Sequence, residues 1–388
     1  MMTEQPPKWI YKLLFLMMLS SSFVLIEPSP YDFLMLLIVC CSLFFSLMRF
    51  SNNVFVPITI ILFFLIFQFI SLLFAKETNI ALNYLTITSY LIISWFVLVG
   101  MGQRLGISFL RVVMNGYLIS AVISAVIGIL AYFQLILLND SFVMYGRAKA
   151  FFKDPNVFGP FLIMPSLYVI SLFEKEQVSK YKKITYALIF LTLLTAILVS
   201  FSRAAWGNWT ISILIYFILT KKEFLQRKFK TIVTLGVLCI PILIWITQSE
   251  FVEKLFQSRL SIQGYDESRF GTQKTALLTG LQNPFGIGPG QSENMFQMAP
   301  HSLYARILTE NGILSVLLFV FILVISMSKA FKSYKQSFDE SAAYFLVICA
   351  SLIGLAFNSI FIDTLHWRHF WLLLALAWCA PRQRGVDM

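Results

Sequence analysis

A long polar segment, residues 248–301, interrupts an otherwise apolar chain and ends on one of only three histidines, His301. The residues that follow, 302–310, have the pattern of a helix, so His301 stands just before a first turn. The positive end of a helix dipole disfavours the imidazolium, and a neutral imidazole is the form that accepts a proton. The segment has too many aromatic and aliphatic residues for a disordered linker. His301 is therefore a candidate general base, although a lone histidine is more often structural.

A second cluster of polar residues lies in residues 145–159, where Arg147, Lys149 and Lys153 precede Pro155 and Asn156. One interpretation is a surface loop whose lysines extend to the membrane edge. The other is an anion-binding loop above a helix N-terminus, with Asn156 as the helix cap. Pro155 and Gly159 are expected to break regular helix here, before the span that begins near residue 158.

Two further arginines are candidates for binding an anion. Arg203 stands in Ser-Phe-Ser-Arg-Ala-Ala-Trp, between two apolar stretches that almost touch. Arg269 precedes a predicted surface helix at 272–282, which a Pro/Gly-rich turn at 283–290 follows. Either arginine could simply extend to the interface, but ionisable groups at the membrane edge are functional candidates by default. A guanidinium holds phosphate oxygens in bidentate geometry.

The last cluster is residues 361–369, which contain Asp363, His366, Arg368 and His369. These side chains could orient His301 or bind a polar substrate. They could equally form an interfacial cap on the last two spans. His366 and His369 have helical spacing, but no cluster of Cys, Asp or Glu completes a metal site. We therefore predict neither a required metal nor a cofactor.

The elements that must position these residues are membrane helices. The 388 residues are 58% hydrophobic and 13% charged, with a mean hydropathy of +0.79, which excludes an ordinary soluble domain. Apolar runs long enough to cross a bilayer recur along the chain. They predict an all-α polytopic membrane protein with about twelve spans, at residues 9–26, 31–48, 54–74, 82–100, 112–138, 158–173, 184–201, 203–220, 230–247, 312–330, 341–362 and 367–380.

Lysine-rich connectors, such as residues 175–183 and 221–230, alternate with lysine-poor ones. The positive-inside rule places the lysine clusters and both termini in the cytoplasm. The chain then forms one transmembrane domain, 1–388, with an extracytoplasmic loop subdomain at 248–311 that contains short helices. The net charge of +11 reflects topology, so we expect no nucleic-acid partner. All five cysteines fall in predicted spans, which argues against a disulfide framework.

The sequence resembles the O-antigen ligase and Wzy-type polysaccharide polymerase family of bacterial membrane proteins. The resemblance covers about residues 145–315 and rests on several short motifs in a fixed order. They are Arg147-Ala148 with Asp154-Pro155-Asn156, Phe201 to Trp206, Arg269, Asn283 to Gly290, His301 to Tyr304, and Glu310 to Leu314. One position departs from the family, because Ser302 stands where members often have asparagine after the histidine.

The resemblance implies an all-α fold related to the C-type membrane glycosyltransferases. It implies metal-independent transfer of a glycan from undecaprenyl diphosphate to a hydroxyl acceptor, on the periplasmic side of the bacterial cytoplasmic membrane. His301 corresponds to the family's ligase histidine, and Arg203 and Arg269 to its two key arginines. With these we group Arg147 as a further candidate for the diphosphate. Candidate substrate-binding residues are Lys149, Asn156, Tyr304, Asp363 and Arg368.

The remaining hypotheses about the reaction differ in the acceptor of the glycan. A polymerase passes the glycan to another lipid-linked repeat unit, a ligase passes it to lipid A–core, and some relatives glycosylate protein. We favour a polymerase of O-antigen, capsule or exopolysaccharide, for which a chain-length regulator would be a further partner. A transporter or flippase is the alternative of another class. However, the ionisable residues cluster at span ends, and no internal repeat is visible. A metal-dependent glycosyltransferase would have only Glu27 and Asp32 as acidic residues in its first outer loop.

Overall fold

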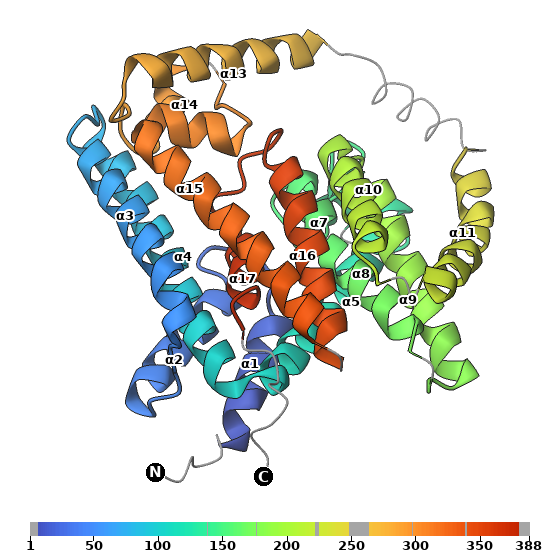
Figure 1. Cartoon of the computed structure of the whole chain (residues 1–388). Helices are drawn as coiled ribbons and strands as arrows, with labels where there is room; N and C mark the ends of the chain where they lie inside the picture. The colour runs from blue at the N-terminus through green and yellow to red at the C-terminus, as the bar shows by residue number, and fades with distance from the viewer. Residues whose placement is uncertain are drawn as a thin grey trace.

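The computed structural model describes residues 7–137, 139–175, 177–221, 225–247, 264–296, 298–337 and 340–379. Residues 248–263 of the predicted extracytoplasmic loop therefore lie outside the described residues. Helices account for almost all of the regular structure (Figure 1). Their bounds are α1 Lys8–Leu19, α2 Pro30–Phe44, η1 Asn52–Val54, α3 Phe55–Leu72, α4 Thr78–Leu105, α5 Ile107–Tyr132, α6 Asn139–Phe142, α7 Pro155–Phe161, α8 Ile163–Phe173, α9 Lys180–Val199, α10 Arg203–Ile218, α11 Leu225–Thr247, α13 Gly264–Gln282, α14 Ser292–Met295, α15 Leu303–Gln336, α16 Glu340–Asn358 and α17 Arg368–Leu376. A two-residue antiparallel ribbon, β1 Val143–Met144 and β2 Arg147–Ala148, completes the fold.

The prediction of an all-α membrane protein is confirmed, whereas the span count stays a prediction. Among the described residues, seven helices are long and apolar enough to cross a bilayer, and α3, α4, α5 and α9 are four of them. Each of the twelve expected spans lies on a helix or a helix pair. However, α1 has 12 residues and α17 has nine, fewer than the ~20 that a straight crossing needs.

The start of α1 and the end of α17 point to the same end of the molecule, and α13 lies across the opposite end (Figure 1). The core between these ends is apolar and rich in aromatic side chains. Phe319 of α15 is fully buried between Phe64 of α3, at 5.4 Å, and Phe370 of α17, at 5.8 Å between ring centroids. The prediction that both termini are cytoplasmic agrees with this arrangement but is not tested by it.

Helix α15 contains the two elements expected at 302–310 and 312–330, joined through a kink at Gly312. Gly312 has φ 87° and ψ 177°, a conformation that is open almost only to glycine. At the kink, nearby backbone N–H and C=O groups lack hydrogen-bond partners within the helix. Backbone groups of the Pro/Gly-rich turn supply those partners instead. Ile313 N–H donates to the Pro284 carbonyl at 3.0 Å, and Gly288 N–H donates to the Glu310 carbonyl at 3.0 Å. The turn therefore completes a broken membrane helix.

Helix α13 begins at Gly264, eight residues before the predicted start at 272. The predicted start was wrong, because the helix continues through Gly271 toward the N-terminus. A glycine in a helix interior costs only ~1 kcal/mol relative to alanine. Packing of α13 against α15 offsets that cost: a Cβ on Gly280 would approach the Leu308 side chain to 2.6 Å. Arg269 thus lies inside a regular helix rather than before one.

Candidate active site

His301 is half-buried directly before Ser302, the N-cap of α15, whose hydroxyl accepts a hydrogen bond from Ala305 N–H at 3.4 Å. Burial lowers the pKa of His301 below its ordinary value of 6.5, and the positive charge of Arg269 lowers this pKa further. The carboxylates of Asp154 and Asp363 act in the opposite direction, but the net shift is downward. The imidazole is therefore neutral at pH 7 and able to accept a proton.

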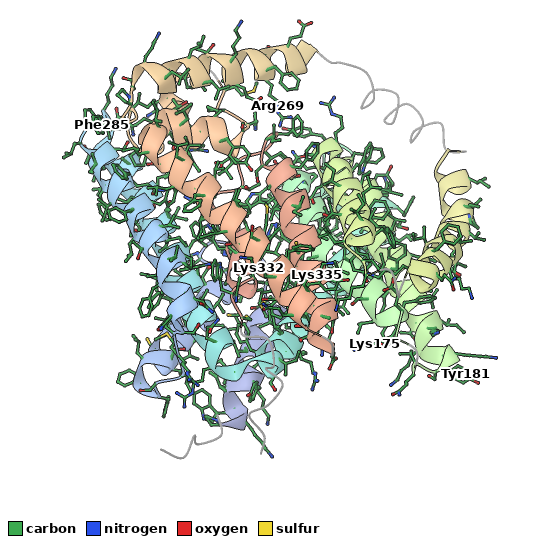
Figure 2. All side chains as sticks on the ribbon, in the orientation of Figure 1. Lys175, Tyr181, Arg269, Phe285, Lys332 and Lys335 are labelled. Carbon is green, nitrogen blue, oxygen red and sulfur yellow. The ribbon has the colours of Figure 1, made fainter. Side chains whose placement is uncertain are left out.

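The charges that act on His301 come from three of the segments that the sequence singled out. Arg269 belongs to α13, Asp154 to residues 145–159 and Asp363 to residues 361–369. Figure 2 shows Arg269 at α13, at one end of the bundle. Its guanidinium also donates a hydrogen bond to the Phe361 carbonyl, which connects α13 to the last of these segments. The tertiary structure thus brings candidate residues that are far apart in sequence to one end of the bundle.

Arg203 is the first residue of α10, and Ser202 caps this helix by accepting from Ala205 N–H at 3.3 Å. The expected tight turn is confirmed, because α9 ends at Val199. Phe201 takes a φ of 46° in this turn, a conformation that costs of order 1–3 kcal/mol for a non-glycine residue. The guanidinium is half-buried on the first turn of the helix. Its role with the diphosphate stays a prediction.

Arg147 is buried and directed into the protein. Its Nε donates to the Ser200 carbonyl at 2.9 Å, and its terminal nitrogen donates to Asn156 Oδ1 at 2.8 Å. These contacts hold residues 145–159 against the turn that carries Arg203. The expectation that Asn156 caps the next helix was wrong. The cap is Asp154, which accepts from Asn156 N–H at 2.7 Å, because Pro155 occupies the first helical position.

The remaining predicted substrate residues have different surroundings. Lys149 is half-buried near Arg147, and burial lowers the pKa of its ammonium group. The Tyr304 hydroxyl donates to the Ala356 carbonyl at 2.9 Å, which fastens α15 to α16. Arg368 forms two hydrogen bonds of 2.7 Å to Asp32. These contacts give Tyr304 and Arg368 structural partners, and substrate contacts by these residues stay predictions.

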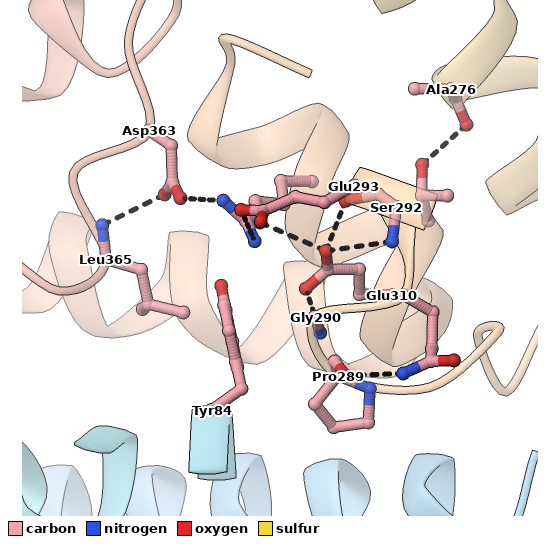
Figure 3. Close-up of polar contacts among 12 residues, drawn as sticks. Tyr84, Ala276, Pro289, Gly290, Ser292, Glu293, Glu310, Asp363 and Leu365 are labelled. Atoms are coloured by element: carbon pink, nitrogen blue, oxygen red, sulfur yellow. Dashed lines mark hydrogen bonds and ion pairs between the residues drawn. The ribbon is translucent and has the colours of Figure 1, made fainter. Parts of the chain in front are cut away.

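Arg306 and Glu310 form a buried ionic cluster that sequence reasoning did not identify (Figure 3). Arg306 contacts three carboxylates: Glu310 at 3.0 Å, Asp363 at 2.9 Å and Glu293 at 3.0 Å. Its guanidinium also lies 4.9 Å from the centre of the Tyr84 ring. The sequence signal that could have identified this cluster is the spacing of Arg306 and Glu310, a basic and an acidic residue four positions apart on one helix.

Glu310 is fully buried and accepts hydrogen bonds from several donors besides Arg306. Gly290 N–H donates to it at 2.8 Å, and the Ser292 hydroxyl is a further donor. The cluster therefore joins α15 to the Pro/Gly-rich turn. Through the ion pair of Arg306 with Asp363, it also joins α15 to the segment 361–369. It holds in place the loops that surround His301.

His366 and His369 do not form a metal pair. The His366 ring is hydrogen-bonded to Thr88 Oγ1 at 3.0 Å and packs 4.2 Å from the Tyr84 ring, and burial lowers its pKa to about 4. His369 packs edge-on against Phe161. Over the described ranges, no three potential metal ligands gather at one point. Metal independence nonetheless stays a prediction.

Comparison with known proteins supports the family assignment over the central part of the chain. Residues 188–320 match the family model described as O-antigen ligase. The matched region runs from within α9 to the middle of α15, and it contains Arg203, Arg269, His301 and the Arg306–Glu310 cluster. A search of curated proteins gave no match. The chain is thus an all-α membrane protein whose residues 188–320 are similar to the O-antigen ligase family, the family that its sequence resembles.

Proposed function

We propose that this protein transfers a glycan from undecaprenyl diphosphate to a hydroxyl acceptor at the outer face of the bacterial cytoplasmic membrane. The observation that carries the proposal is the position of His301. It lies just before the start of α15, burial and the charge of Arg269 lower its pKa, and charged residues from three separate segments act on it. A neutral base beside a cation is what transfer to a hydroxyl from a diphosphate donor requires.

In the proposed reaction, the acceptor hydroxyl gives its proton to the neutral imidazole of His301. The acceptor oxygen then forms a bond to the anomeric carbon of the donor sugar. The bond between that carbon and the diphosphate oxygen breaks, and its electron pair stays on the diphosphate. The proton is later released from the imidazolium, whose lowered pKa favours this step.

Arg203 and Arg269 are proposed to balance the charge that develops on the departing diphosphate, with Arg147 positioning the loop beside them. A guanidinium can serve in this role without a metal because it stays protonated and offers paired donors. The activity of the purified protein is therefore expected to be unchanged by EDTA. Inhibition by EDTA that added Mg²⁺ or Mn²⁺ reverses would contradict the metal-free mechanism.

The acceptor that we favour is a second lipid-linked repeat unit, which makes the protein a polysaccharide polymerase and a chain-length regulator a candidate partner. Ligation to lipid A–core is the second candidate, and the similarity of residues 188–320 to the O-antigen ligase family favours it. Deletion of the gene followed by gel and mass analysis of the surface glycan separates the two. Single repeat units left on the acceptor indicate a lost polymerase. Lipid-linked long chains with a bare acceptor indicate a lost ligase.

A further inference from the structure

A cavity of about 120 Å³ lies where the end of α1, the start of α2, residues 152–161 and the start of α17 meet. Most of its wall is apolar and includes the rings of Tyr31, Phe152 and Trp367. Polar side chains from Lys153, Arg368 and His369 also line it. Apolar pockets with a few convergent polar groups are the usual form of small-molecule sites.

The charges at this cavity balance one another. Arg368 is paired with Asp32, and Lys153 contacts Glu27 at 2.6 Å. Two cations thus face two carboxylates, so the site offers no net positive charge to a phosphate. It offers both hydrogen-bond donors and hydrogen-bond acceptors next to aromatic rings. That combination suits an uncharged molecule with several hydroxyl groups and an apolar ring face.

His369 supplies an independent sign that a ligand belongs here. Its side chain is 94% buried, since only 6% of the residue is exposed. Within the described part of the chain, its Nε2 has no hydrogen-bond partner. Its ring is held by Phe161 at 5.7 Å and by Trp367 at 5.1 Å between centroids. A buried polar atom without a partner costs ~1–3 kcal/mol. Because Nε2 is itself buried, a bound hydroxyl group would remove this cost once the ring turns Nε2 toward the cavity.

The cavity is connected to the candidate active site by a chain of side-chain contacts. The ring of His366, another residue of the cavity wall, packs 4.2 Å from the Tyr84 ring. Arg306 lies 4.9 Å from the centre of the same Tyr84 ring and pairs with Asp363 at 2.9 Å. Arg306 belongs to the first turns of α15, the helix that His301 precedes. An oligosaccharide whose acceptor hydroxyl lies at His301 would therefore reach the cavity past this ionic cluster.

We infer that this cavity is the subsite for a neutral sugar ring of the acceptor glycan, with one hydroxyl of that ring hydrogen-bonded to His369. The inference rests on the proposed glycan transfer and adds the chemical class and the place of the acceptor subsite. An aromatic wall would pack on the apolar face of the ring, and the paired charges at the mouth would bind its outer hydroxyls.

The test uses the purified full-length His301→Ala protein, in which binding is measured without turnover. Saturation-transfer NMR would be recorded with methyl glucoside, galactoside and mannoside, and with methyl glucuronide as the anionic counterpart. A neutral hexoside is expected to give a signal that His369→Phe and the cavity-filling Val157→Phe reduce about tenfold. His369→Gln, which keeps a hydrogen-bonding group, should retain part of it. Val56→Phe, at an exposed valine of α3, is the matched control and should leave the signal unchanged.

Signals that are equal in the cavity variants and in the control would overturn the inference. A response to methyl glucuronide or inorganic phosphate alone would overturn it as well, because the cavity would then be an anion site. If His369→Phe lowers the melting temperature, the binding signal of the Val157→Phe variant decides whether the cavity binds the sugar. The proposed reaction is judged separately by comparing polymer in cells with wild-type and His301→Ala protein. Equal polymer would refute that reaction whatever the cavity binds.

Discussion

Arg306 of α15 differs from Arg203 and Arg269 in what it contacts. Arg306 is buried and held by three carboxylates of its own protein. Arg203 and Arg269 are half-buried on the first turn of α10 and on α13, and Arg269 donates to a neutral backbone carbonyl. The charge of Arg269 lowers the pKa of His301 more than the charge of Arg306 does.

This difference indicates a division of labour. An ionic cluster whose groups are saturated by one another holds loops in place, because removing one partner leaves a buried charge uncompensated. A cation near the surface can instead act on a substrate. Substitutions in the Arg306–Glu310 cluster should therefore change stability, whereas substitutions at His301, Arg203 and Arg269 should change activity and leave the fold intact.

The largest expected effect is that of His301→Ala, which removes the proposed base. The transfer rate should fall by ~10²–10⁴, and long-chain glycan should disappear from cells. The amount of protein in the membrane and its melting temperature in detergent should stay at the wild-type values. Retention of long-chain glycan in the variant would refute the assignment of His301 as the base.

Arg203→Ala and Arg269→Ala should each lower the rate of glycan transfer by ~10²–10³, as for the loss of one donor to a developing anion. The matched control is Arg111→Ala, because Arg111 lies on α5 and forms a half-exposed ion pair with Glu340 at 2.6 Å. That variant should keep wild-type activity. If the control loses as much activity as the two variants, the loss reflects general damage rather than the diphosphate.

In the ionic cluster, Arg306→Met should destabilise the folded protein by ~3–5 kcal/mol, because Glu310 would remain buried without its cation. The double variant Arg306→Met with Glu310→Met should be less destabilised than the sum of the single changes. Thermal unfolding in detergent measures both quantities. Full additivity would mean that the two side chains do not interact energetically.

Gly312→Ala should lower stability by more than the ~1–3 kcal/mol that such backbone geometry costs a non-glycine residue. The new methyl group would also meet the Pro284 carbonyl oxygen at 2.2 Å. Gly271→Ala is the matched control, since nothing lies within 4 Å of its Cβ position. It lies in a helix interior, where alanine is favoured by ~1 kcal/mol. Equal melting temperatures for the two variants would contradict the account of the kink.

The smallest expected effect is a shift in the pH profile. His301 must be neutral to accept a proton, so activity should fall as the pH drops through its lowered pKa, below 6.5. Arg269→Met removes a positive charge that lowers this pKa, so the acidic limb of the remaining activity should move to higher pH. Asp154→Asn and Asp363→Asn should move it to lower pH. If none of the three substitutions moves the acidic limb, then His301 is not the group whose protonation causes the loss of activity.

Much of the architecture follows from the sequence alone, because the signals are local. Hydrophobic length predicts membrane helices, and seven helices of the described residues are long and apolar enough to cross a bilayer. Ser-Phe-Ser-Arg predicts the tight turn before α10, since serine is a strong cap. The glycine pattern of 283–290 predicts turns. His301 and the arginines were singled out because charged groups are costly at a membrane edge and stay only where they have partners or a role.

Only the tertiary structure decided which of these residues meet. Burial and neighbouring charges set the pKa of His301, and those charges come from residues as far apart in sequence as Asp154 and Asp363. The structure also showed that Arg306 is held by ion pairs with three carboxylates inside the protein. It showed that the Pro/Gly-rich turn completes a kinked helix. Composition and spacing indicate how unfavourable each charged residue is at the membrane when it is taken alone. The interaction energy between two charges depends on their distance and burial, which are defined only in the folded chain.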